Sequence, residues 1–438
     1  MNAAATDSSP HHDRSKDASA SDQTGIDAAT RDAGIRWTAR HAHEGSAFFR
    51  DLIDASGIRP DDITGAADLH RLPFTTKEHL REHGPWGLTA VPMADVVRMH
   101  SSSGTTGRRT ICTYTQPDLD AWTQQFARCY SYAGVSHDDR VQIAVGYGLW
   151  TAGVGFQAGA EAVGAMSVPT GPGNTDLQLE AILELKTTVL GATASFALLL
   201  AELIDQRGLR DEAALRVGIF GSERWGEATR RRIDQTLGIE SFDIYGLTEL
   251  WGPGTGIECH LHNGIHVWSD HYHVEVVDPE TLEPVPEGQP GELVLTTLGK
   301  QATPLLRYRT RDMSSLLPGP CDCGSPHPRI ARLTGRTDDA CKIRGVLVVP
   351  AQVDIVLGPM HDHTSGEFQL HVDRDERGRD IATVRVETSH PAPATFAEEV
   401  AVRLRDHIGV RIDVEPVGIG TLGRSERKTA RLFDHRDP

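Results

Sequence analysis

The sequence predicts an α/β fold, with a large N-terminal domain that has mainly parallel sheets and a β-rich subdomain, followed by a small α+β domain. Three observations predict this. Between Asp118 and Phe242, apolar segments of strand length alternate with helical segments, which is typical of βαβ units around a parallel sheet. After Tyr245 the chain reads as successive strands. From Gly335 to Pro438 it reads as a further, smaller α+β unit.

The chain has 438 residues and a formal net charge of −17. At roughly 100–200 residues per domain, this length suits two or three domains. No basic stripe is visible, so a dedicated nucleic-acid binder is disfavoured. No segment reaches the roughly 18 consecutive apolar residues that indicate a membrane span, so we expect no membrane insertion.

Residues 1–25 are rich in Ala, Ser, Asp and His and lack the apolar region of a secretory signal. We expect a disordered tail here, because this composition cannot bury enough apolar surface. An N-terminal domain is expected over residues 26–335 and a C-terminal domain over residues 339–438. The location is then expected to be cytoplasmic, where structural disulfides are uncommon. The six cysteines are therefore expected to be buried thiols or metal ligands.

Apolar spacing predicts the elements of the N-terminal domain. The expected helices include Ala121–Tyr132, Asp176–Leu185, Phe196–Ile204 and Trp225–Leu237. The expected strands are Val96–His100, Thr110–Tyr114, Val141–Val145, Thr188–Leu190, Arg216–Phe220, Val267–Val277, Gly291–Thr297 and Thr303–Tyr308.

The segment His100–Thr110, HSSSGTTGRRT, carries two glycines and several hydroxyl side chains between two strand-like stretches. Glycine lets a backbone approach a ligand closely, and hydroxyl and amide groups donate hydrogen bonds to phosphate oxygens. The loop Ser101–Gly107 is therefore a candidate phosphate-binding loop. It lacks the pattern of a Walker loop, and a flexible hairpin would have the same composition.

Two further segments place a carboxylate beside a strand. In FDIYGLTELWGPG, residues 242–254, Glu249 follows an apolar strand, and a carboxylate in that position can hold Mg²⁺ beside phosphates. A surface glutamate in a turn is the alternative. In LLRYRTRDMSSLLPG, residues 305–319, Asp312 could accept hydrogen bonds from ribose hydroxyls, or it could pair with Arg309 or Arg311.

Two segments near the C-terminal domain complete the set. LTGRTDDACKIRG, residues 333–345, contains adjacent acidic residues that could act as a hinge. LGRSERKTARLFDHR, residues 422–436, places Lys428 in a basic, polar segment, which a solvated basic face would also show.

The order and spacing of these segments resemble the adenylate-forming superfamily, and more closely the phenylacetate–CoA ligase family. The resemblance runs from about Leu72 to Arg436. It rests on LPFTTKEHLREHGPWGL, SSSGTTGRRT, GYGLWTAGVGFQAGAEAVGAMSVPTGPGNT, DIYGLTELWGPG, RYRTRD, GRTDD, KIRG and RSERKTAR, which match family segments in the same order.

This resemblance implies that ATP and Mg²⁺ activate an aromatic or arylacetic carboxylic acid as an acyl-adenylate, with release of pyrophosphate. The C-terminal domain would then rotate about a hinge at Asp338, and CoA would take the acyl group as a thioester with release of AMP. A carrier protein, an amine or another nucleophile is the alternative acceptor. A nucleotide-binding homologue without activity is a third possibility. A homodimer is a reasonable expectation from the family.

The resemblance also implies residue roles. The ATP phosphates would be held by Ser103, Gly104, Thr105, Thr106 and Gly107. The rest of the ATP site would comprise Gly221, Ser222 and Glu223 along the adenine, Asp243, Tyr245, Gly246 and Thr248 beside it, and Asp312 and Arg336 at the ribose. Glu249 would ligate Mg²⁺, and Lys428 would act on the reacting oxygens during adenylation. The chain departs from the family pattern at Arg108, where lysine is usual, at Ser222, where alanine is usual, and at Arg427, where glycine is usual.

The acid pocket is expected near Tyr147, Gly148 and Trp150, because an aromatic and apolar lining suits an aryl or arylacetic acid. Ordinary core packing is an equal alternative for these aromatic residues.

Three cysteines and a histidine could form a metal site. Cys259 and His266 bracket CHLHNGIH, and Cys321 and Cys323 form CDCG. Three thiolates and one imidazole suit a tetrahedral structural Zn²⁺, and some members of the resembled family carry a comparable cluster. Unconnected thiols and histidines are the alternative, and the competing ligands are His260, His262, His271 and His273. The other cysteines, which are Cys112, Cys129 and Cys341, are expected in the core.

Overall fold

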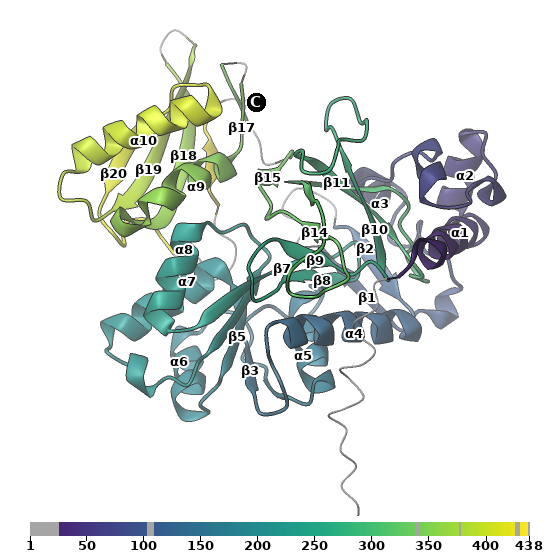
Figure 1. Cartoon of the computed structure of the whole chain (residues 1–438), viewed down its shortest axis with the longest axis horizontal. Helices are drawn as coiled ribbons and strands as arrows, with labels where there is room; N and C mark the ends of the chain where they lie inside the picture. The colour runs from purple at the N-terminus through teal and green to yellow at the C-terminus, as the bar shows by residue number, and fades with distance from the viewer. Residues whose placement is uncertain are drawn as a thin grey trace, which may run out of the picture.

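The computed structural model describes residues 26–102, 109–338, 341–344, 346–375, 378–424 and 430–436. It confirms the predicted α/β class, with one large mixed sheet, a smaller antiparallel sheet and a separate C-terminal sheet. Figure 1 shows the C-terminal domain packed against one end of a larger body, while the N-terminal helices lie at the opposite end. Within the described part of the chain, no helix combines the length and apolar character that a bilayer span requires.

The large sheet has nine strands. They are β3 Arg140–Ile143, β4 Met166–Val168, β5 Val189–Thr193, β6 Val217–Gly221, β7 Glu240–Leu247, β8 Gly252–Glu258, β9 Ile265–Val267, β13 Leu316–Leu317 and β14 Arg329–Ile330. Their order is β13-β14-β9-β8-β7-β6-β5-β3-β4. The five strands from β4 to β7 in this order are parallel, as the alternation of segments predicted, and the other four pair antiparallel.

Helices cover both faces of this sheet (Figure 1). They are α4 Gln116–Tyr132, α5 Ala152–Ala162, α6 Thr175–Glu184, α7 Ala194–Gln206 and α8 Glu227–Leu237. Consecutive strand residues point to opposite faces. In β6, Ile219 belongs to the core that contains Phe126 of α4 and Phe156 of α5, whereas Phe220 belongs to the core that contains residues of α6, α7 and α8. A strand with both faces covered must be apolar throughout, which is why these segments were recognisable from sequence.

Capping sets the start of α4. The hydroxyl of Thr115 accepts from the backbone N–H of Asp118 at 3.2 Å, and the Asp118 carboxylate accepts from the backbone N–H of Thr115 at 3.0 Å. This reciprocal pair is a capping box. The helix therefore begins at Gln116, one turn before the start that apolar spacing predicted.

The β-rich part of the N-terminal domain is an antiparallel sheet of β10 Tyr272–Val277, β11 Gly291–Thr297, β12 Tyr308–Ser314 and β15 Gly335–Arg336. Packed near it are α1 Ala28–Gly45, α2 Ala47–Ala55, α3 Lys77–Glu82 and the hairpin β1 Arg98–Ser101 and β2 Ile111–Tyr114. Among these elements, α3, β12 and β15 carry residues that line the candidate site.

Two expected strands were wrong in extent. The segment Val267–Val277 is divided into β9 and β10, because the Trp268 carbonyl accepts from the backbone N–H groups of His271 and Tyr272 and forms a turn. The segment Thr303–Tyr308 is a buried connection before β12 and contributes only its last residue to that strand. Arg307 has φ 44°, in the left-handed region, which interrupts the extended backbone just before β12 begins.

The C-terminal domain has its own hydrophobic core, which includes Phe368, Val384 and Leu404. Its elements are β16 Cys341–Ile343, β17 Val346–Val348, α9 Pro350–Leu357, β18 Thr364–Arg374, β19 Asp380–Thr388, α10 Pro393–Ile408, β20 Asp413–Val417 and β21 Leu432–Asp434. The sheet order is β20-β19-β18-β21. The expected boundaries, 26–335 and 339–438, stay predictions. Close packing joins the domain to α8, since a side chain at Gly366 would come within 2.5 Å of the Thr229 hydroxyl.

Candidate active site

A cavity of about 1340 Å³ lies between the sheet ends of the N-terminal domain and α9 of the C-terminal domain. It gathers eleven of the site residues that the sequence predicted. Those on its wall are Trp150, Ser222, Glu223, Asp243, Tyr245, Gly246, Thr248, Glu249, Asp312, Arg336 and Asp338. The carboxyl ends of the parallel strands β6 and β7 supply several of them, which is where ligands bind in open α/β sheets.

The residues Gly221, Ser222 and Glu223 form the turn at the end of β6. A side chain at Gly221 would lie 2.4 Å from the carbonyl oxygen of Ile244, so only glycine fits there. Ser222 has φ 69°, which turns the chain sharply toward the cavity. Glu223 accepts from the backbone N–H of Ser195 at 2.7 Å, at the start of α7. The turn is therefore fixed to the neighbouring helix.

Asp312 lies at the centre of a buried polar group. The Tyr245 hydroxyl donates to one carboxylate oxygen at 2.9 Å, and Arg336 donates to the other at 2.6 Å. Burial raises the pKa of Asp312, and the Arg336 charge opposes that rise. The alternative pairing with Arg309 or Arg311 does not occur. Arg309 and Arg311 both pair with Glu292 on β11 instead, at 2.7 and 3.9 Å.

Arg336 also binds the expected hinge residue. Its Nε and Nη2 donate to the two carboxylate oxygens of Asp338 at 2.8 and 3.0 Å. One guanidinium therefore connects the buried Asp312 to the half-exposed Asp338, which lies where the chain leaves the N-terminal domain.

Glu249 is buried at the turn after β7. Its carboxylate accepts from the Thr110 hydroxyl at 3.0 Å and lies 3.6 Å from the ammonium of Lys77 on α3. Its backbone carbonyl accepts from Lys300 at 3.0 Å. A buried carboxylate that faces a polar cavity fits the oxygen ligand that Mg²⁺ takes beside phosphates.

The expected phosphate-loop residues Ser103, Gly104, Thr105, Thr106 and Gly107, and the expected catalytic Lys428, lie outside the described residues. The described residues next to them do line the cavity: Ser102 before the loop, and Ala430 and Arg431 after the lysine.

The acid-pocket residues divide into two groups. Trp150 lies on the cavity wall. Tyr147 and Gly148 precede it in the same loop but are not among the described residues that line the cavity. The ring of Tyr147 packs over Gly153, where a side chain would come within 2.6 Å of it, and its hydroxyl donates to Gln157 at 3.2 Å. Their substrate role stays a prediction.

Several residues of the site were missed in the sequence. Trp225, after the β6 turn, lies between the guanidinium groups of Arg230 and Arg332, which are 4.7 and 5.2 Å from its ring centroid. Arg332 also pairs with Asp243 at 3.3 Å. Burial raises the pKa of Asp243, and Arg332 opposes that rise. A single aromatic residue followed by distant arginines carries no sequence signal of such stacking.

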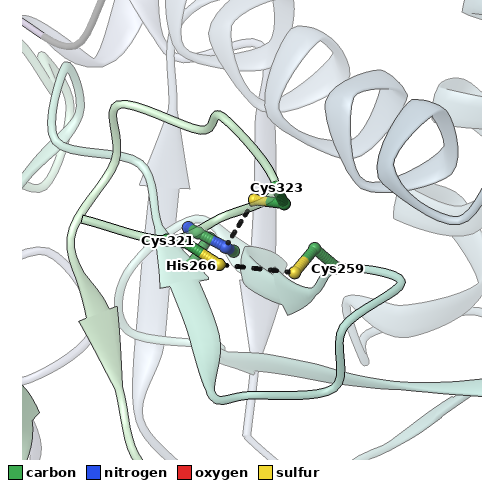
Figure 2. A group of neighbouring side chains, drawn as sticks. All are labelled: Cys259, His266, Cys321 and Cys323. Atoms are coloured by element: carbon green, nitrogen blue, oxygen red, sulfur yellow. Dashed lines mark hydrogen bonds between the residues drawn. The ribbon is translucent and has the colours of Figure 1, made fainter.

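The predicted cysteine and histidine cluster comes together at the edge of the large sheet. The ligand atoms of Cys259, His266, Cys321 and Cys323 all lie within 4.8 Å of one another (Figure 2). Cys259 follows β8, His266 lies on β9, and the other two lie between β13 and β14. The Nδ1 of His266 is 3.1 Å from the His327 carbonyl, to which it would donate, which leaves Nε2 directed at the thiols.

This donor set fits the tetrahedral thiolate and imidazole coordination of Zn²⁺. None of the competing histidines His260, His262, His271 and His273 belongs to the cluster that the described residues form. His262 instead contacts Glu240 and Glu258. The cysteines outside the cluster, which are Cys112, Cys129 and Cys341, are buried as expected.

Two family models match the chain. One, described as AMP-binding enzyme, matches residues 27–299, and one, described as AMP-binding enzyme C-terminal domain, matches residues 345–436. The phenylacetate-coenzyme A ligase of Escherichia coli is 40% identical over 414 residues, which are 92% of this chain and 93% of that protein.

Solved structures of a 2-hydroxyisobutyryl-CoA ligase are also similar. In its postadenylation state with 2-HIB-AMP, that protein is 27% identical, with a TM-score of 0.84 over 92% of this chain and 89% of the other. In its thioesterification state with 2-HIB-AMP and CoA, it is 28% identical, with a TM-score of 0.68 over 93% of this chain and 90% of the other.

Proposed function

The chain belongs to the AMP-binding enzyme family, and we propose that it activates an aromatic or arylacetic carboxylic acid with ATP and then forms the CoA thioester. The observation that carries this proposal is that Asp312, Arg336 and Glu249 line one cavity together with Ser222 and Glu223 of the β6 turn. Identity of 40% to a phenylacetate-coenzyme A ligase over nearly the whole chain supports the aromatic acid and the CoA acceptor.

In this proposal the cavity residues bind ATP along its length. The adenine lies beside Ser222, Glu223, Asp243 and Tyr245, and Gly246 and Thr248 complete that wall. The ribose hydroxyls donate to Asp312, which Arg336 and Tyr245 already hold in place. The phosphates extend toward Ser103–Gly107 and Glu249. Glu249 would hold Mg²⁺, which when bound supplies positive charge next to the phosphates.

The chemical difficulty of the first half-reaction is that a carboxylate must approach the anionic α-phosphate. Fixed positive charge and hydrogen-bond donors around the phosphate lower this barrier. Lys77 and Arg431 line the cavity and supply charge from opposite domains. Lys428 is proposed to bring an ammonium to the reacting oxygens during adenylation only.

The second half-reaction is proposed to follow rotation of the C-terminal domain about Asp338. The relative has been solved in both arrangements, and this chain is more similar to the postadenylation structure than to the thioesterification structure, with TM-scores of 0.84 and 0.68. Transfer to a carrier protein or an amine remains the alternative. Structural Zn²⁺ at the Cys259 cluster is part of the proposal. A cytoplasmic location and a homodimer stay predictions.

The test is exchange of labelled pyrophosphate into ATP across a panel of acids. Phenylacetate and benzoates represent the aromatic class, and 2-hydroxyisobutyrate is the aliphatic comparison. We expect exchange with at least one aromatic acid, and a thioester identified by mass spectrometry once CoA is added. Exchange without a thioester from any activated acid would exclude CoA as the acceptor. Exchange with aliphatic acids alone would overturn the substrate class.

A further inference from the structure

Lys300 is a completely buried lysine that the proposed reaction does not use. It lies in the loop after β11, and its ammonium donates to the backbone carbonyls of Glu249, at 3.0 Å, and of Leu250. The ammonium also lies 5.2 Å from the ring centroid of Tyr114 and 5.4 Å from that of Trp251. Burial lowers the pKa of Lys300, and nearby negative groups, including Asp118 and Glu249, oppose that fall.

The two carbonyls belong to the turn that presents Glu249. In the segment Thr248–Trp251, Lys300 donates to the two central carbonyls, those of Glu249 and Leu250. The Tyr114 hydroxyl lies 3.0 Å from the Trp251 oxygen, to which it donates its one proton, and 3.4 Å from the Thr248 oxygen. Two buried side chains therefore contact four consecutive carbonyls and donate firmly to three of them, which fixes the peptide planes of the turn on the side away from the cavity.

The loop that carries Lys300 is itself held rigidly. The Asp118 carboxylate accepts from the backbone N–H groups of Gln301 at 2.7 Å and Ala302 at 2.9 Å. The Thr303 hydroxyl accepts from the backbone N–H of Thr113 at 3.1 Å. The backbone of Lys300 is therefore held in place after β11 of the smaller sheet. From there its ammonium reaches the turn that follows β7 of the nine-stranded sheet.

On its other side, Glu249 faces the cavity with its carboxylate, held by Thr110 and near Lys77. We propose that Lys300 is a positioning residue for Glu249, which fixes the backbone of its turn so that the carboxylate points at the Mg²⁺ and phosphate position. The inference rests on the proposed role of Glu249 in ATP binding. It assigns to Lys300 no contact with substrate or with the reacting atoms.

An apolar side chain in place of the Lys300 ammonium would change the balance of buried groups at the turn. A buried charge is costly, and an apolar side chain of similar volume would avoid that cost. It would also leave two buried carbonyls without donors. The peptide planes would then turn toward other donors and carry the Glu249 carboxylate with them. Because Mg²⁺ demands near-ideal octahedral geometry, a small displacement of one ligand weakens metal binding.

The test compares Lys300→Met with Thr303→Val. The first keeps the length and volume of the side chain but removes the charge and the donors. The second removes two buried hydrogen bonds between Thr303 of the same loop and Thr113, and it leaves the donors to the Glu249 turn in place. In Lys300→Met, we expect the Mg²⁺ concentration for half-maximal pyrophosphate exchange to rise about tenfold or more, as for the loss of other outer partners of a metal site. We expect it to stay at the wild-type value in Thr303→Val.

Two further measurements separate positioning from folding. Calorimetric titration of ATP into the protein, with and without Mg²⁺, should show that the contribution of Mg²⁺ to affinity is lost in Lys300→Met. Thioester formation from a supplied acyl-adenylate and CoA should stay within twofold of wild type, because no phosphate-bound metal takes part. An unchanged Mg²⁺ requirement, or an equal loss in both half-reactions with a lower melting temperature, would show that Lys300 only stabilises the fold.

Tyr114→Phe gives the same information if Lys300→Met does not fold. It keeps the ring beneath the ammonium and removes the hydroxyl that contacts the outer two carbonyls. We expect a smaller rise in the Mg²⁺ requirement, and an unchanged requirement would overturn the inference. If the wild-type protein exchanges pyrophosphate with no acid, the proposed function is overturned. The role of Lys300 is then tested by calorimetry alone, as the effect of Lys300→Met on Mg²⁺-dependent ATP binding.

Discussion

Asp234 on α8 shows how burial of one carboxyl creates a pH-dependent stability. Burial raises the pKa of Asp234 to about 6, while the nearby Ser241 hydroxyl and the charges of Arg230 and His262 oppose the rise. The unfolded chain has the ordinary aspartate pKa, near 3.9. Between these values the folded protein binds the proton more tightly. The stabilising contribution is therefore complete below about pH 4 and is lost as the pH rises through 6.

Asp234→Asn should remove this dependence. At pH 8 the wild-type protein holds a desolvated carboxylate that asparagine avoids, so we expect the free energy of unfolding to rise by about 1–2 kcal/mol. At pH 4 the gain should vanish. Thermal unfolding of both proteins across this range checks the prediction. The exposed Asp176 on α6 is a matched control, and Asp176→Asn should show no pH-dependent gain. A gain for Asp234→Asn that is equal at both pH values would contradict the stated cause.

At the scale of the element, the sequence predicted the helices and strands whose apolar residues follow a regular local pattern. Parallel strands buried on both faces are apolar throughout, so β5 and β6 could be predicted from the sequence. Glu249 could be predicted as a site residue because it follows such a strand. The side chains that contact the site residues could not be predicted from the sequence. The pairing of Asp312 with Arg336 depends on the register of β12 with β15. The hydrogen bonds from Lys300 to the Glu249 turn join segments about 50 positions apart. The prediction of a strand over Thr303–Tyr308 was wrong because a buried connection has the same apolar composition as a strand.

The cysteine and histidine cluster joins elements that backbone hydrogen bonds connect only weakly. The strands β13 and β14 have two residues each, so they contribute few ladder bonds at the edge of the large sheet. We expect one Zn²⁺ per chain by elemental analysis. A strong chelator or Cys321→Ser should remove the metal and lower the melting temperature by several degrees, because a bound metal stabilises only the folded state.

Cys341→Ala provides the comparison for this experiment. Cys341 is also buried, but it lies in the C-terminal domain and outside the cluster. Its variant should keep a full zinc content whatever its melting temperature. A wild-type protein that contains no zinc when purified with the metal present, and whose melting temperature a chelator does not change, would contradict the zinc prediction.

At the scale of the whole molecule, charged residues join the two domains. Arg424 forms a bidentate pair with Glu202 of α7, at 2.8 and 3.0 Å. It forms a second pair with Glu387 of β19, at 2.8 and 3.0 Å. Arg224 binds Asp354 of α9 across the same boundary. These arginines are mostly buried, so their pairs are screened far less than surface pairs. They favour the present domain arrangement, which is the one shared with the postadenylation relative.

Glu202→Gln should therefore affect the two half-reactions differently. The substitution removes the charge that Arg424 meets across the boundary and leaves the Glu387 pair, so the C-terminal domain keeps its fold. We expect the present arrangement to lose on the order of 1–2 kcal/mol, about 5- to 30-fold in population. Pyrophosphate exchange should slow accordingly if, as proposed, adenylation takes place in this arrangement. Thioester formation from supplied acyl-adenylate should stay the same or become faster. The substitution destabilises only the present arrangement, so the rotated arrangement proposed for thioester formation becomes relatively more populated.

The exposed Asp205 on the same helix serves as the control, and Asp205→Asn should leave both rates unchanged. Equal slowing of both half-reactions by Glu202→Gln would mean that the Arg424 pair supports folding rather than one arrangement. An unchanged exchange rate would mean that other contacts, such as Arg224 with Asp354, are sufficient to hold it. Arg224→Gln in the Glu202→Gln background then separates these cases: if the two pairs share the work, the double variant should slow exchange by more than the product of the single effects.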